Sequence, residues 1–110
     1  MTSVEERFAS IAEVELQAPG VTRGTGFGRS EGLRISGKIF AMLVRGELVV
    51  KLPKGRVVEL SAAGVGHPFD SGKGQLMKEW ISVPVKAGRR WPALVEEARE
   101  FARPARRRRP

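Results

Sequence analysis

The stretch that decides the fold covers residues 26–52 and reads GFGRSEGLRISGKIFAMLVRGELVVKL. It contains six consecutive apolar residues, 39–44, and a second apolar run, 48–50, beyond a turn at Arg45-Gly46-Glu47. Two short apolar runs on either side of a turn are typical of antiparallel strands that pair with each other. The stretch therefore predicts the centre of an antiparallel β-sheet.

The segment before this stretch has a helical pattern. Val4, Phe8 and Ile11 recur at helical spacing behind a capping box that begins at Ser3. We therefore expect an amphipathic helix over residues 3–16, whose apolar side packs on the sheet.

The rest of the chain adds strands, a short helix, a loop and a final helix. Strand patterns occur three or four times within residues 21–52 and once more over residues 76–83. Residues 56–63 have a helical pattern that ends at Gly64, and residues 64–74 are rich in turn formers and are expected to form a loop. An apolar stripe at helical spacing predicts the final helix: Trp91, Leu94, Val95, Ala98, Phe101 and Ala102.

These elements predict an α+β, two-layer domain over residues 1–103, in which an antiparallel β-sheet carries the N- and C-terminal helices. Residues 104–110 read PARRRRP and are expected to be a disordered, arginine-rich tail. Of the 20 basic residues, five are Arg103 and Arg106 to Arg109. The charges of the other 15 are largely balanced by those of the 12 acidic residues. Most of the net charge of +8 therefore lies within residues 103–110, and no strongly basic surface is predicted for the folded part.

The composition excludes several classes of site. The 110-residue chain has no cysteine, and His67 is its only histidine. We therefore expect no disulfide, no metal site and no cofactor. The longest apolar run is too short to cross a bilayer, and the first ten residues have no basic segment followed by an apolar one. A cytoplasmic protein with no membrane contact is expected.

Several motifs occur together in a characteristic order. Gly26-Phe27-Gly28 is followed by GLRISGKIFAM at residues 32–42 and by ELVVKL at residues 47–52, and later by Pro68-Phe69 and by a Met77, Trp80, Val83-Pro84 pattern. Together these motifs, within residues 4–102, resemble the TfoX N-terminal domain family, with the YjbR (MmcQ-like) family as the nearest relative. Gly26 stands where the family usually has methionine, Arg29 where it has a second glycine, and Trp80-Ile81 where it has a tyrosine pair.

The resemblance implies an α+β domain whose antiparallel sheet is covered by helices on one side. It implies no established catalytic residues, because the family's N-terminal domain is known mainly as part of a competence regulator. Such regulators carry a second, C-terminal domain, which we expect this chain to be too short to hold. The resemblance therefore implies a non-enzymatic accessory or regulatory domain rather than the role of a whole regulator.

Two segments match catalytic or nucleotide-binding motifs only in part. Residues 32–38 fit G-x-x-x-x-G-K, but Ile39 stands where a phosphate loop needs Ser or Thr. A hairpin turn is the preferred interpretation there. His67, Asp70 and Ser71 offer the residue types of a hydrolase triad, but triad members normally converge from separate elements. Local turn roles are preferred for these three residues.

Most carboxylates are expected to lie on solvated helix faces: Glu5, Glu6, Glu13, Glu15, Glu96, Glu97 and Glu100. Glu79 is different, because it lies among apolar neighbours in the last predicted strand. Since burying an unpaired charge is costly, we expect Glu79 to form a salt bridge.

The central strand is apolar on both of its faces, since all six residues from 39 to 44 are apolar and alternate in direction. If the helices lie on one side, the other face presents an apolar patch, and we expect Phe40, Met42 and Trp80 to form an interaction face there. A homodimer is the preferred explanation of what covers it. A small apolar ligand, or terminal helices on opposite faces of the sheet, are the alternatives.

The arginine run is the second candidate site. Adjacent cations attract polyanions through contacts that do not depend on base sequence, and a solubilising tail is the alternative. The leading hypothesis is a non-enzymatic, TfoX-N-like accessory or regulatory domain that acts through protein contacts as a homodimer. A nucleic-acid-associated protein is the second, and an enzyme that uses the 67–71 loop is the third. The residues of the nucleic-acid hypothesis are Arg103, Arg106, Arg107, Arg108 and Arg109.

Overall fold

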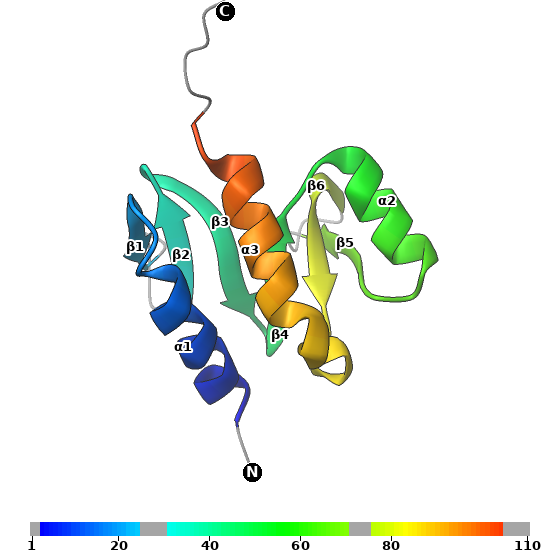
Figure 1. Ribbon diagram of the computed structural model, residues 1–110. Coiled ribbons are helices and arrows are strands. Elements are labelled where there is room, and N and C mark those ends of the chain that lie inside the picture. The colour runs from blue at the N-terminus through cyan, green and yellow to red at the C-terminus, as the bar shows by residue number, and fades with distance from the viewer. Residues whose placement is uncertain (1–2, 25–30, 71–75, 105–110) are drawn as a thin grey trace, which may run out of the picture.

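The computed structural model describes residues 3–24, 31–70 and 76–104. Figure 1 shows a sheet with helices packed against it, so the α+β class is confirmed. The helices are α1 (Val4–Glu15), α2 (Lys54–Ala62), the 3-10 helix η1 (Val85–Arg90) and α3 (Trp91–Ala102). The strands are β1 (Val21–Arg23), β2 (Glu31–Ile35), β3 (Lys38–Val44), β4 (Glu47–Lys51), β5 (His67–Asp70) and β6 (Leu76–Val83).

The described strands form one antiparallel sheet in the order β1-β2-β3-β4-β6-β5. Ser36-Gly37 joins β2 to β3, and Arg45-Gly46 joins β3 to β4. All four residues have positive φ, between 49° and 83°, which is the geometry of two-residue type I′ turns. Both turns lie where the sequence predicts hairpins.

Strand β5 lies within residues 64–74, so the prediction of a loop over this whole segment is wrong. β5 is the outer strand at one side of the sheet and pairs with β6 only. An outer strand tolerates Pro68, because the backbone on its free side makes no ladder hydrogen bonds. The turn-forming composition that favoured a loop is therefore compatible with this position.

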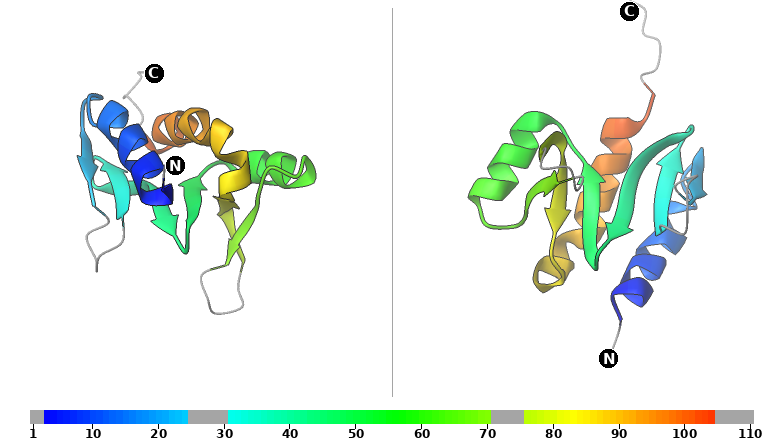
Figure 2. Two further views of the ribbon diagram at one scale, coloured as in Figure 1. Left: turned by 90° about the horizontal axis from the view of Figure 1, so that it is seen from below. Right: turned by 180° about the vertical axis from the view of Figure 1, so that it is seen from behind.

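The three α-helices of the described chain pack on the same face of the sheet (Figure 2). α3 lies across β3 and β4, α2 packs on β5 and β6, and α1 packs beside α3. Phe8 of α1, Leu60 of α2 and Trp91 of α3 belong to one core cluster and are at most 2% exposed. The alternative in which the terminal helices cover opposite faces of the sheet is therefore wrong.

A β-bulge in β3 places Phe40 in the core. Leu33 pairs with Ala41 and Arg34 pairs with Ile39, so Phe40 is an extra residue without a partner on β2. An extra residue interrupts the strict alternation of side chains along a strand. Phe40 and Ala41 are both 0% exposed and both belong to the core cluster. The prediction that Phe40 belongs to the uncovered face is therefore wrong.

Two ion pairs connect the helices to one another. Glu15 of α1 is 4% exposed, and its Oε1 lies 2.8 Å from Nη1 of Arg99 on α3. Burial opposes the charged form of Arg99, but its hydrogen bonds to Glu15 and Glu100 outweigh this effect and raise its pKa. Arg56 of α2 donates to both carboxylate oxygens of Glu97, at 2.7 and 3.2 Å. The expectation of a solvated carboxylate is therefore wrong for Glu15.

Replacing Glu15 with alanine is expected to lower the free energy of unfolding by about 3 kcal/mol, because Arg99, whose side chain is only 15% exposed, loses this partner. Arg99 keeps Glu100 at 3.1 Å, which limits the loss. Urea denaturation followed by circular dichroism measures the change. The control is Glu13→Ala, which removes an exposed carboxylate from the same helix and should change stability by less than about 0.5 kcal/mol. Equal stability of the two variants would contradict the expected role of the pair.

Candidate functional site

The sheet face opposite the helices, called the open face below, has an apolar centre. Met42 of β3 pairs with Val49 of β4, and Val49 pairs with Ser82 of β6, so these side chains point to the same side. Val44 follows Met42 by two residues and shares that side. Val49 is 0% exposed, whereas Met42 and Val44 are half-buried. No helix of the described residues covers this centre (Figure 2).

Lys51 and Trp80 extend the open face along β4 and β6, where they pair with each other. The Lys51 ammonium lies 5.8 Å from the centroid of the Trp80 ring, which is a cation–π distance. Lys51 Nζ also lies 3.9 Å from Oε1 of Glu79. The salt bridge expected for Glu79 is therefore present, although the Glu79 side chain is 44% exposed rather than buried.

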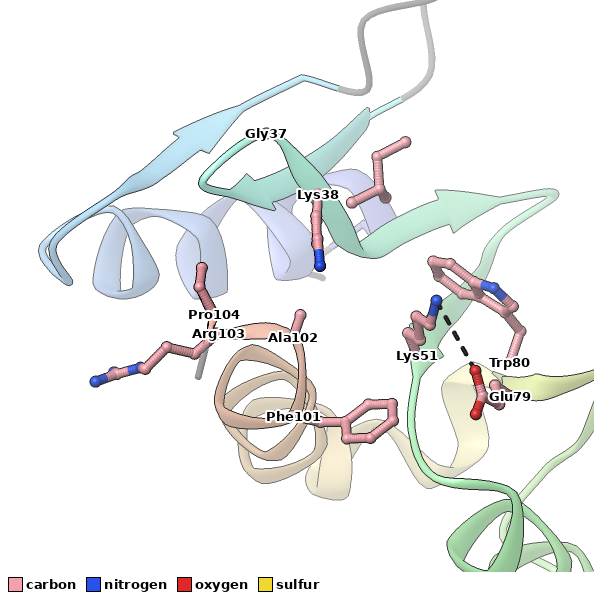
Figure 3. A pocket seen from close by; sticks show the side chains of 10 residues that line it. Gly37, Lys38, Lys51, Glu79, Trp80, Phe101, Ala102, Arg103 and Pro104 are labelled. Atoms are coloured by element: carbon pink, nitrogen blue, oxygen red, sulfur yellow. Dashed lines mark ion pairs between the residues drawn. The ribbon is translucent and has the colours of Figure 1, made fainter. Parts of the chain in front are cut away.

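A pocket of about 590 Å³ lies where α3 ends beside strands β3, β4 and β6. Figure 3 shows Lys51, Glu79 and Trp80 together on one wall, with Phe101 projecting toward them from α3. Lys38 points toward the end of α3 from the start of β3. The pocket thus combines two aromatic rings with charged groups of both signs.

The cations of this pocket differ in how far they are neutralised. Arg103 points away from Lys51 and Trp80 (Figure 3), and its Nη2 lies 2.7 Å from Oε2 of Glu100. Lys51 is paired with Glu79. For Lys38, no carboxylate of the described residues lies within ion-pair distance. The described part of the pocket therefore has a small excess of positive charge, which Lys38 supplies.

A polar cluster lies at the other end of the open face of β4. Ser82 Oγ donates a 2.6 Å hydrogen bond to Oε1 of Glu47, and the same oxygen lies 3.2 Å from Nε2 of His67. In a catalytic triad the histidine stands between the carboxylate and the serine. Here the carboxylate stands between the other two groups, and Ser82 is only 5% exposed. The cluster is therefore suited to connecting β4, β6 and β5 rather than to hydrolysis.

The structure separates the residues that the sequence grouped as sites. Met42 and Trp80 lie on the open face, Phe40 lies in the core, and Arg103 lies at the pocket beside the end of α3. Outside the described residues lie the Phe27-Gly28 motif, Ser71, the arginine run at residues 106–109 and most of the tail expected to be disordered.

Sequence reasoning missed Glu47, Lys51 and Ser82. A signal for the first two was present, because both are two residues from Val49 and must share its face in a regular strand. No comparable signal marked Ser82, since its contact with Glu47 spans 35 residues of sequence and depends on which strands pair.

Comparisons with family models, curated proteins and solved structures found no match for this chain. In the part of the chain that the structure describes, no group of three His, Asp or Glu side chains is arranged to hold a metal ion. Within the same residues, no helix combines the length and apolar character needed to cross a membrane. Function is therefore inferred from the geometry of the open face and of the pocket.

Ser82→Ala is expected to lower the free energy of unfolding by about 2 kcal/mol, because it removes a 2.6 Å hydrogen bond to a charged acceptor and leaves Glu47 Oε1 only the longer, 3.2 Å contact with His67. Thermal denaturation measures the effect as a fall in Tm of roughly 10 °C. Ser10→Ala, at an exposed position of α1, is the matched control and should leave Tm nearly unchanged. A Tm for Ser82→Ala equal to that of the control would show that the cluster does not stabilise the sheet.

Proposed function

We propose that this chain is a non-enzymatic accessory or regulatory domain of the TfoX N-terminal type, which acts through protein contacts and pairs as a homodimer through its open face. The observation that carries the proposal is the one-sided packing of the helices, which leaves Met42, Val44 and Val49 at the centre of a face without a helical cover. Val49 is already 0% exposed, so a second copy placed on this face removes the exposed part of Met42 and Val44 from water, which favours association.

The charges along β4 support pairing between identical copies. Glu47, Val49 and Lys51 share the open face, with the carboxylate at one end of the strand and the ammonium at the other. A two-fold axis that passes over Val49, parallel to the sheet and perpendicular to β4, makes the β4 strands of two copies run in opposite directions. Glu47 of each copy then lies opposite Lys51 of the other. Symmetric dimers require this kind of self-complementary surface.

Charge reversal tests this pairing. Lys51→Glu places carboxylates opposite each other at both ends of the interface, so we expect this variant to be monomeric at concentrations where the wild type is dimeric. Glu47→Lys should also be monomeric, because it places ammonium groups opposite each other. A mixture of the two variants should contain a mixed dimer, in which both ion pairs form again: one as in the wild type and the other with its two charges exchanged. Sedimentation velocity measures the masses.

The control for this experiment is Lys86→Glu, which reverses an exposed charge on η1. This variant should sediment as a dimer at the same concentrations as the wild type. Circular dichroism must show that each variant is folded, since Glu47→Lys also removes the acceptor of the Ser82 hydrogen bond. A wild type that stays monomeric at high micromolar concentration would refute the homodimer. A Lys51→Glu variant that dimerises like the wild type would refute the proposed pairing geometry.

Nucleic-acid association is a second candidate function, favoured by the basic residues near the end of α3. Lys38 adds an exposed ammonium to the pocket there, and Pro104, which also lines the pocket, precedes Arg106 by two residues. Arg103 is bound to Glu100 and has less freedom to bind phosphate. Phosphate contacts in this proposal therefore depend mainly on the arginine run at residues 106–109.

Deleting residues 104–110 is expected to abolish retention of single-stranded DNA in a gel-shift assay at low salt, whereas Arg103→Ala should weaken it less than twofold. Four phosphate contacts predict that the logarithm of the association constant falls by roughly 3 for each tenfold increase in salt concentration. The slope of this dependence therefore gives the number of arginines that contact phosphate. Lys86→Ala is the matched control for the loss of one exposed cation. An intact chain that retains no DNA even at low salt would refute this second function.

A further inference from the structure

A groove of about 410 Å³ lies between α2 and the strands β5 and β6, and its described lining residues are not shared with the pocket at the end of α3. Val57 and Val58 of α2 and Pro68 of β5 form its apolar lining. Val57 is 2% exposed, whereas Val58 is 68% exposed, the largest value among the large apolar side chains of the described residues. The exposed valine is therefore part of a continuous apolar surface rather than an isolated apolar side chain.

Two lysines give this groove positive charge. Lys54 reaches it from the first turn of α2 and Lys78 from β6, and both are exposed. Among the ion pairs of the described residues, none involves either ammonium group. The first turn of α2 contains no acidic residue and has no side-chain cap. The backbone N–H groups at the start of α2 therefore add to the positive potential of the lysines.

We propose that this groove binds an acidic amphipathic peptide segment of a partner protein. An apolar side chain of the peptide contacts Val57, Val58 and Pro68, and its carboxylates lie beside Lys54 and Lys78. Charge complementarity selects this occupant over the same groove of a second copy, because the described lining of the groove contains Lys54 and Lys78 and no carboxylate that could pair with them. The volume of the groove, about 410 Å³, is sufficient for apolar anchor side chains and lies near the lower end of the usual range for binding sites.

The peptide docks through its side chains rather than by adding a strand to β5. β5 is only four residues long, and Pro68 has no N–H group to offer to a new strand. Docking of an amphipathic helix with its apolar stripe in a groove satisfies the backbone of the peptide internally. The geometry therefore points to helix-in-groove recognition on the α2 side of the domain.

Fluorescence anisotropy with the full chain and two matched peptide panels tests the proposal. One panel contains labelled helical peptides with a leucine stripe flanked by glutamates, and the other has lysines in place of the glutamates. The acidic peptides should bind, and their affinity should fall with increasing salt. Reversing the charge of both lysines (Lys54→Glu with Lys78→Glu) should lower the affinity for acidic peptides at least about tenfold and allow basic peptides to bind. Val58→Asp should also lower the affinity for acidic peptides, because it places a carboxylate in the apolar contact.

Controls separate this groove from the other surfaces. Lys86→Glu should leave peptide affinity unchanged, and so should Lys51→Glu, which acts on the open face. Amide shift perturbations on addition of an acidic peptide should gather in α2 and in the neighbouring parts of β5 and β6. The proposal is overturned if no acidic peptide binds more tightly than its basic counterpart, or if the perturbed amides lie on the open face. Oleate that binds this groove when the acidic peptides do not would identify an anionic lipid as the occupant and would also overturn it.

Discussion

Attachment of the α-helices to one side of the sheet is the constraint on which the rest of the structure depends. The buried stripe of α3 packs across β3 and β4, and ion pairs join α3 to its neighbours: Glu15 to Arg99 for α1, and Arg56 to Glu97 for α2. Because these helices form one connected layer, none of them covers the opposite face. The apolar residues at the centre of the sheet therefore face a helical core on one side and the open face on the other.

The fold class was predictable because it depends on local patterns. Apolar runs, hairpin turns and the stripe of the final helix repeat at the spacing of the elements they form. Phe40 was misplaced because strict alternation assumes a regular strand, and a bulge depends on how two strands pair. β5 was missed because a proline indicates a loop unless the strand is known to lie at the edge of a sheet, and the sequence alone does not show that Pro68 lies there. Glu15 was expected in solvent because its partner, Arg99, is 84 residues away.

The candidate site was predictable only in part, and for the same reason. Met42 was placed on the open face by alternation along β3, whereas the position of Trp80 on the same face follows from the pairing of β4 with β3 and β6. The approach of Phe101 to Trp80 depends on where the end of α3 lies over the sheet, which no local pattern determines. The charges of Glu47 and Lys51 give the open face a polarity that fits a second copy in the opposite direction. The groove beside α2 has a different character, because its described lining residues carry positive charge and include no carboxylate.

The central claim is that the open face is covered by a second copy of the chain, and tryptophan fluorescence tests it most directly. The chain has two tryptophans. Trp91 is 0% exposed in the core, whereas Trp80 is partly exposed at the end of the open face. Acrylamide quenching over a range of protein concentrations therefore reports on Trp80. The account predicts a quenchable fraction that falls as the concentration rises and dimers form. A quenchable fraction that stays constant from nanomolar to high micromolar protein would contradict it.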